Sequence, residues 1–169
     1  DRLWDVDTVI VPVGGGGLIT GIATVLKHFN PYIHIVGVQS ENVHGMTASL
    51  QAGKLTRQCT GPTLADGTAV AMPGDITFGL AEELVDEMVL VSEEEIAEAM
   101  KDLLQRTKTV AEGAGALPTA ALEAHKIAPQ WLAGKKVVAL VSGGNVDLER
   151  VADNIDHFFK SDPTGHFIG

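Results

Sequence analysis

Apolar and polar residues follow two alternating patterns along this chain. Short runs rich in Val and Ile are typical of strands covered on both faces, and they are separated by stretches in which apolar residues recur every three or four positions, as on one face of a helix. The predicted strands are 8–13, 34–39, 87–91 and 136–141. The predicted helices are 18–29, 47–53, 76–85, 93–106, 115–125 and 148–159.

Strand and helix alternate throughout, and this order predicts an α/β fold. We expect three αβα layers around a mostly parallel sheet of about four strands. The loops that follow parallel strands gather at one edge of the sheet, and ligands of such folds bind there. These loops are therefore the places in which to look for chemistry.

Two of the predicted helices carry specific boundary signals. Ser92 and Glu95 have the spacing of a capping box, which predicts that a helix begins at position 93. Pro118 lies within the fifth predicted helix, where a proline removes an N–H donor and clashes with the preceding turn. That helix is therefore expected either to begin near Pro118 or to bend there.

A run of four glycines connects the first predicted strand to the first predicted helix. Residues without Cβ let several backbone N–H groups converge on one anion, and the dipole of the helix that begins there adds attraction. We interpret the run as a phosphate-binding loop; the alternative is a glycine-rich turn without a ligand. Its residues are Gly14, Gly15, Gly16, Gly17 and Leu18.

The spacing of this run excludes two common nucleotide-binding motifs. The dinucleotide pattern Gly-x-Gly-x-x-Gly would need a glycine at position 19 or 20, where the chain has Ile19 and Thr20. A mononucleotide P-loop would need Lys and Ser or Thr after Gly21, where the chain has Ile and Ala.

Three further loops combine small residues with groups suited to a ligand. The segment 61–68 is long for a connection, which suggests a loop shaped around a ligand rather than a plain surface loop. Glu112 stands beside glycines at a helix start; it either serves a ligand or only complements the helix dipole, as acidic residues at this position commonly do. Ser142 follows the last predicted strand and precedes Gly143 and Gly144, so it either presents a hydroxyl to a flat ligand or caps a turn.

Composition narrows the class of protein. The 169 residues, 45% of them hydrophobic, can bury the core of one domain. A net charge of −10 without a basic face argues against a nucleic-acid partner. Cys59 is the only cysteine, which excludes an internal disulfide and fits a reducing cytoplasm. Neither a membrane-spanning stretch nor a signal peptide is expected.

Taken together, the loops resemble those of a known family. The chain resembles the C-terminal half of the fold-type-II pyridoxal-phosphate enzymes, and within them the catabolic threonine dehydratases, with the serine racemases as near relatives. The likeness extends from about Val6 to Asp153. It rests on the stretches GGGGL, VQSENVHGM, LADGT, EELVDEMVLVSEEEI, EGAGAL and SGGNVDL.

The resemblance implies a β-elimination that converts L-threonine or L-serine into a 2-oxo acid and ammonia, with pyridoxal 5'-phosphate as cofactor. The phosphate would be held by the backbone amides of the glycine run, and the Ser142 hydroxyl would meet the pyridine nitrogen. Glu112 resembles the family carboxylate near the ring, as the candidate catalytic group. The implied cofactor-binding residues are Gly14, Gly15, Gly16, Gly17, Leu18, Gly67, Glu112, Ser142 and Gly143.

The same resemblance raises the question of a metal ion. In serine racemase relatives, a Glu after the second strand, a carbonyl and an Asp bind a divalent cation; here Glu41 and the Gly45 carbonyl stand in the first two places and Thr47 in the third. We therefore expect no tightly bound divalent ion, with Glu41 and Gly45 as a weak candidate site for a monovalent cation. The six histidines lack the spacing of metal ligands.

The resemblance implies that part of the active site lies outside this chain. In such enzymes the lysine that binds the cofactor comes from the N-terminal half, so we expect a fragment that is inactive alone. Residues 1–157 are expected to form the C-terminal portion of the cofactor-binding domain, and 158–169 a poorly ordered tail. The alternative is a non-catalytic module of the same fold that binds a phosphate or nucleotide and acts as a regulator.

The expected partners follow from the resemblance. They are a small amino-acid substrate, the missing N-terminal half, further copies of the chain in a homo-oligomer, and an AMP-type effector. Exposure of the core of a severed domain would leave an apolar patch that favours association.

Overall fold

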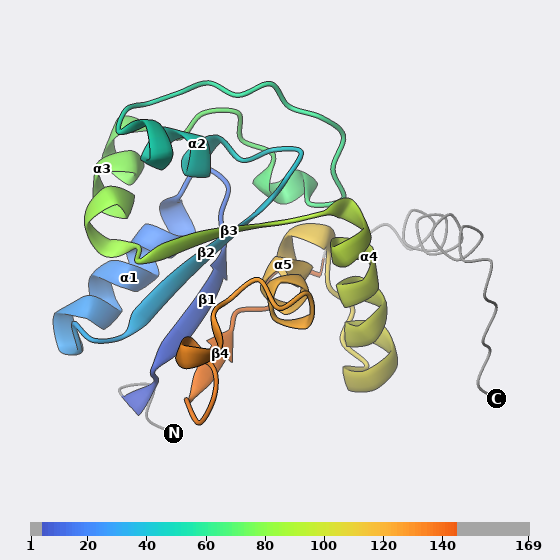
Figure 1. The fold of residues 1–169 in the computed structure, drawn as a ribbon. Helices are drawn as coiled ribbons and strands as arrows, with labels where there is room; N and C mark the ends of the chain where they lie inside the picture. The colour runs from blue at the N-terminus through green and yellow to red at the C-terminus, as the bar shows by residue number, and fades with distance from the viewer. Residues whose placement is uncertain (1–4, 145–169) are drawn as a thin grey trace.

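A parallel four-stranded sheet forms the centre of the protein (Figure 1). The computed structural model describes residues 5–144. The strands lie in the order β3-β2-β1-β4, and each adjacent pair is parallel. All four predicted strands are present, which confirms the predicted α/β fold. They are β1 (Thr8–Pro12), β2 (His34–Ser40), β3 (Glu87–Val91) and β4 (Val137–Ala139).

Within the described part of the chain, five α-helices connect and cover the strands. They are α1 (Gly17–Phe29), α2 (Gly45–Ala52), α3 (Asp75–Leu84), α4 (Glu93–Asp102) and α5 (Gly113–Glu123). The predicted helix 148–159, the predicted tail 158–169 and the last part of the predicted domain lie outside the described residues.

The boundary signals have different outcomes. The capping box is present: the Ser92 hydroxyl accepts from the Glu95 N–H at 3.3 Å, and the Glu95 carboxylate accepts from the Ser92 N–H at 2.8 Å. α4 ends at Asp102, and a π-helical turn, Leu103–Thr107, follows it directly. Pro118 lies inside α5, five residues after its first residue, so the expectation of a start near Pro118 is wrong. 

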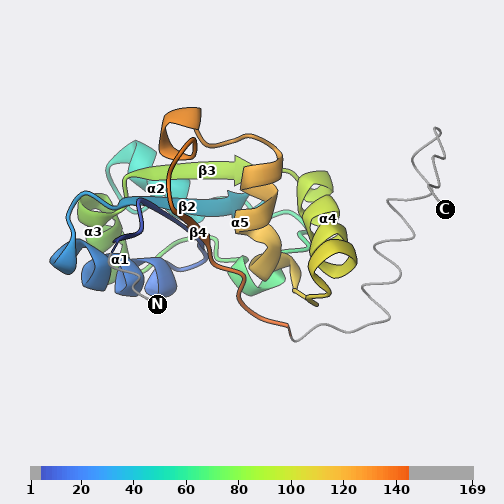
Figure 2. The ribbon, with the colours of Figure 1, turned by 90° about the horizontal axis from the view of Figure 1, so that it is seen from below.

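The helices form two layers, one on each side of the sheet (Figure 2). Figures 1 and 2 both show α1 and α3 on one side of the strands and α4 and α5 on the other. Along β1, Val9 and Val11 pack in one cluster with α1 residues such as Ile19, whereas Ile10 packs in another with Leu117 of α5. This alternation is the period of two expected for a strand covered on both faces.

The centre of the sheet is more deeply buried than its edge. Every residue of β1 and β2 is buried, whereas those of β4 are only half-buried. Within residues 5–144, no helix is both long enough and apolar enough to cross a membrane.

The carboxyl ends of β1 and β4 point to the same edge because the two strands are parallel, and the loops that follow them meet there.

Candidate functional site

A cavity of about 240 Å³ lies at the carboxyl edge of the sheet. It is lined by the glycine run after β1, by the 3₁₀ turn Asp66–Thr68, by the start of α5 and by the loop after β4. Eight of the nine predicted cofactor-binding residues line it, namely Gly14, Gly15, Gly16, Gly17, Leu18, Gly67, Glu112 and Ser142. The structure therefore brings together four segments that are far apart in the sequence.

The glycine run leads directly into the first turn of α1. Gly16 is the N-cap, with φ +94° in the left-handed region, and it has no side chain with which to cap the helix. The first intrahelical hydrogen bond is donated by the Thr20 N–H to the Gly16 carbonyl oxygen at 3.0 Å. The N–H groups of Gly17, Leu18 and Ile19 precede that bond, so they are the donors that a helix start leaves for a ligand.

One side of the glycine run is closed and the other is open. A Cβ built on Gly16 would overlap the end of the Met46 side chain and come within 3.1 Å of Thr77 Cβ. A Cβ built on Gly17 would meet no atom within 4 Å. α1 has no acidic residue in its first turn to repel an anion. The run therefore forms a cradle of backbone donors that fits a phosphate group in both size and charge.

The loop after β4 is pressed against the start of α5. The Glu112 N–H donates to the Gly143 carbonyl oxygen at 3.3 Å, and a Cβ built on Gly115 would overlap the Ser142 carbonyl oxygen. Gly143 has φ +75°, and a Cβ on it would overlap the Glu112 carboxylate. Gly143 itself is not part of the cavity wall. Its missing side chain makes room for the Glu112 carboxylate, and its role in binding the cofactor stays a prediction.

Glu112 is the N-cap of α5, but its side chain does not cap the helix. Its Oε1 atom lies 3.4 Å from the position that a Cβ on Gly67 would take. The carboxylate therefore lies between the loop after β4 and the 3₁₀ turn, where it lines the cavity with Gly67 and Ser142.

An unpredicted carboxylate anchors the loop that carries Gly67. Glu93 Oε1 accepts from the Ser40 hydroxyl at 2.6 Å, and Glu93 Oε2 accepts from the Leu64 N–H at 2.7 Å. One side chain thus ties the end of β2 to the loop and to the first turn of α4. For this stretch the sequence predicts only the Ser92–Glu95 capping box. The partners of Glu93 are distant in sequence and leave no local signal.

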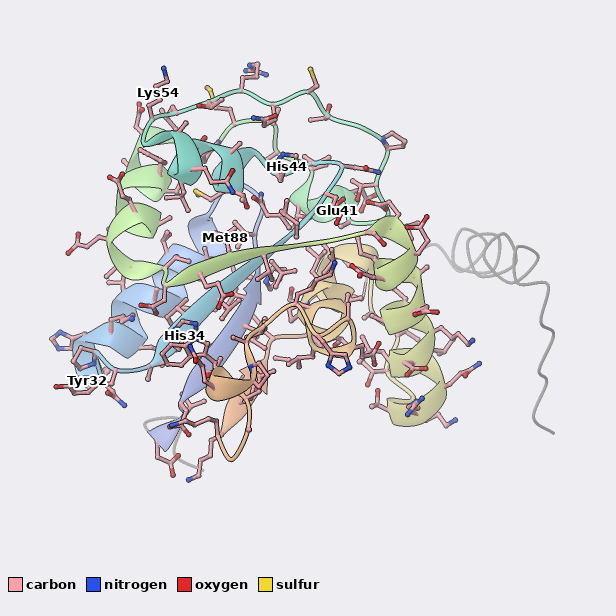
Figure 3. The ribbon with its side chains drawn as sticks, in the orientation of Figure 1. Tyr32, His34, Glu41, His44, Lys54 and Met88 are labelled. Atoms are coloured by element: carbon pink, nitrogen blue, oxygen red, sulfur yellow. The ribbon has the colours of Figure 1, made fainter. Side chains whose placement is uncertain are left out.

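The candidate cation residues lie away from the cavity. Glu41 is exposed after β2, and its carbonyl oxygen accepts from His44 Nδ1 at 2.7 Å (Figure 3). Gly45 begins α2, and its carbonyl oxygen accepts from the Ser49 hydroxyl at 2.7 Å. Among the described residues, no group of three or more His, Cys, Asp and Glu side chains is arranged to hold a metal ion. The cation site remains a prediction.

Thr47, in the third place of that predicted set, serves the fold instead. Its N–H and hydroxyl both donate to Gln39 Oε1, at 2.9 and 2.8 Å. Gln39 is fully buried on β2, so these bonds fix the start of α2 against the sheet.

Comparisons with known proteins agree with this arrangement. Residues 3–143 match the family described as pyridoxal-phosphate dependent enzymes. The chain is 62% identical over 157 residues to the catabolic L-threonine dehydratase TdcB of Staphylococcus aureus strain N315, covering 93% of this chain and 45% of that protein.

Solved structures give the same picture. Maize serine racemase superposes with a TM-score of 0.81 at 33% identity, over 94% of this chain and 48% of that one. The processed form of threonine deaminase isoform 2 from Solanum lycopersicum gives 0.79 at 36% identity, over 90% and 44%. The chain thus spans a little under half the length of these relatives.

Proposed function

The chain belongs to the family of pyridoxal-phosphate-dependent enzymes, and on that premise we propose that it forms the cofactor-binding part of an ammonia-lyase acting on L-threonine or L-serine. The reaction is a β-elimination in which the Cα proton and the β-hydroxyl leave as water, and a water molecule then hydrolyses the imine form of the product to a 2-oxo acid and ammonia. One observation carries the proposal: the glycine run, which begins α1 without a side-chain cap, and Ser142 line the same cavity.

The glycine run binds the phosphate of the cofactor. The N–H groups of Gly17 and Leu18, at the positive end of the α1 dipole, would donate to the phosphate oxygens, and Gly14, Gly15 and Gly16 would surround the phosphate. A phosphate group suits this position because the wall is made of backbone and carries no acidic side chain in the first turn of α1.

Ser142 would meet the pyridine nitrogen across the cavity. A neutral hydroxyl accepts or donates one hydrogen bond and does not force the nitrogen to stay protonated. When bound, pyridoxal phosphate supplies an electron sink for the charge left on Cα, and a hydroxyl partner makes that sink moderate. A moderate sink suits elimination of a β-hydroxyl.

Glu112, Gly67 and Gly143 complete this side of the site. The Glu112 carboxylate holds the turn after Ser142 in place and is the candidate group to move a proton near the cofactor ring. Gly67 leaves space for the ring beside that carboxylate. The domain expected at 1–157 then forms one face of the active site.

The lysine that joins the cofactor is proposed to come from outside this chain. None of the residues that line the cavity in the described part of the chain is a lysine, and the chain covers 45% of the staphylococcal dehydratase. We therefore propose that the chain alone binds the cofactor without turning over substrate, since the exchange steps of the cycle need an amine at that point.

The proposal is tested by separating binding from turnover. Purified chain is titrated with pyridoxal phosphate and followed by ³¹P NMR of the phosphate; it is then assayed with L-threonine for 2-oxobutanoate, alone and after addition of the N-terminal half of the staphylococcal relative. We expect binding in each case and turnover only in the mixture. Turnover by the chain alone, or absence of cofactor binding, would contradict the proposal.

We also propose an assembly, a regulator and a location for the protein. A homo-oligomer is supported by apolar residues exposed along α1, namely Leu18, Val25 and Phe29. An AMP-type effector is proposed from the family resemblance alone, and a cytoplasmic location is supported by a single exposed thiol, Cys59. Sedimentation with and without AMP tests the first two. AMP binding that displaces the cofactor from the cavity would favour the regulatory-module alternative.

A further inference from the structure

We propose that Thr77 is a positioning residue for the glycine run: its hydroxyl fixes the peptide plane between Gly15 and Gly16 and so aims the Gly16 N–H into the cavity. The inference rests on the proposed function of the run as a phosphate site. Sequence reasoning gave Thr77 no role, because it lies 62 positions beyond Gly15 in the chain.

The contact itself is short and specific. Thr77 Oγ1 donates to the Gly15 carbonyl oxygen at 2.6 Å, whereas its distance to the Gly74 carbonyl oxygen in its own helix start is 3.1 Å. A hydroxyl has one proton to donate, and the shorter contact is the stronger hydrogen bond. Thr77 therefore links α3 to the loop after β1. The helix that follows this loop, α1, packs against α3.

Peptide geometry turns this contact into an orientation of the next donor. In a planar trans peptide the C=O and the following N–H point in opposite directions. Because the Gly15 carbonyl points to Thr77 on α3, the Gly16 N–H points away from α3. Gly16 lines the cavity, so this donor is available there.

A run of four glycines needs such a constraint more than an ordinary loop does. Glycine backbones have more conformational freedom to lose than any other residue, so an unanchored run would bind an anion only after an additional ordering cost. Thr20 anchors the next peptide in the same way, since its hydroxyl donates to the Gly16 carbonyl oxygen at 2.7 Å. Thr20 belongs to the helix that the run begins, whereas Thr77 holds the run from a separate element.

The test compares three variants of the 169-residue protein. Thr77→Val removes the hydroxyl and keeps the shape, and Thr77→Ser keeps the hydroxyl. Thr24→Val is the matched control, because the Thr24 hydroxyl also donates to a backbone carbonyl, that of Thr20, at 2.7 Å, without touching the run. Each is titrated with pyridoxal phosphate and with pyridoxal, which lacks the phosphate, and amide hydrogen exchange is measured over 14–19 without ligand.

We expect Thr77→Val to weaken binding of pyridoxal phosphate about three- to tenfold, to leave pyridoxal binding unchanged and to speed exchange of the 14–19 amides. Thr77→Ser and Thr24→Val should behave as the unaltered protein. Equal losses for both ligands would indicate a merely structural role and overturn the inference, as would unchanged exchange. If the unaltered protein shows no preference for the phosphate form, the proposed function fails, while the exchange data still decide whether Thr77 orders the run.

Discussion

The two ends of the sheet are closed in different ways. At the carboxyl end, the loop after β4 meets the start of α5 through backbone atoms, as at Gly115 and in the hydrogen bond from the Glu112 N–H to the Gly143 carbonyl oxygen. At the amino end, the His34 ring stacks on Trp131 with centroids 3.8 Å apart, and its Nε2 lies 3.2 Å from Glu87 Oε2. Figure 3 shows His34 and Glu41 at opposite ends of β2.

The difference teaches what each end is for. Around His34, side chains satisfy one another through ring stacking, a hydrogen bond and an ion pair. Backbone contacts at glycines leave the neighbouring donors without side-chain partners, and the carboxyl end therefore keeps a cavity in which N–H groups remain available. We expect substitutions at the two ends to separate stability from binding.

The largest effect is expected from Gly115→Ala. The added Cβ overlaps the Ser142 carbonyl oxygen, a backbone atom that cannot move without shifting the whole turn. We expect the free energy of unfolding to fall by about 1–3 kcal/mol, as for other overpacked sites. Binding of pyridoxal phosphate should weaken as well, because Ser142 moves. Urea unfolding and ³¹P NMR titration measure the two effects.

The control for this substitution is Gly21→Ala in α1. Gly21 is also a helical glycine, but a Cβ there meets no atom within 4 Å. The free energy of unfolding should stay the same or rise by about 0.5–1 kcal/mol, since alanine is the better helix former. Equal effects of the two substitutions would mean that the contact with Ser142 does not constrain the loop.

A smaller effect is expected at the amino end from Trp131→Leu. Leucine keeps an apolar side chain against the core but removes the stacked ring, so the free energy of unfolding should fall by about 1–2 kcal/mol. Trp131→Phe, which retains a ring, should lose less. Urea unfolding followed by circular dichroism gives the values. Cofactor affinity should not change. A loss of cofactor affinity larger than that caused by Gly115→Ala would contradict the distinction between the two ends.

The smallest effect is expected from Asp7→Asn, also at the amino end. The Asp7 carboxylate accepts from the Lys136 N–H at 2.8 Å, and this bond, helped by the Lys135 ammonium, lowers the pKa of Asp7 below its ordinary value of 3.8. A lowered pKa stabilises the fold above pH 3.8, and this contribution is lost as the pH falls through the folded-state pKa.

Thermal unfolding at several pH values measures this contribution. At pH 7 the Asn variant should melt on the order of 1–2 °C lower, because an exposed carboxylate contributes little. The difference should shrink as both proteins are taken to strongly acidic pH, where Asp7 is protonated. A difference that stays constant with pH would show that the charge has no part in it.

The fold was largely predictable because its signals are local. The short runs rich in Val and Ile and the Ser92–Glu95 capping box depend on residues within a few positions of one another, and the strands and the helix start that they predict are confirmed. The prediction at Pro118 was wrong about where the helix begins. Most of α5 is buried against the sheet, and this burial stabilises a helix whose start local propensity places later.

The residues that line the candidate site were predictable from the sequence, but the hydrogen bonds that hold its loops in place were not. The glycine run and Ser142 follow strands, and the parallel sheet brings their loops to one cavity. Glu93 and Thr77 were missed because their hydrogen bonds join residues 29 and 62 positions apart. Such pairs arise from tertiary packing, and a single sequence carries no periodicity or spacing that indicates them.

The Glu112 carboxylate occupies the space that a side chain at position 143 would take. A residue with a side chain at 143 would displace this carboxylate, and its backbone would also be strained, because φ at Gly143 is +75°. Truncation of Glu112 removes only the first of these two costs, so glycine is needed at 143 even in a variant that lacks the acid.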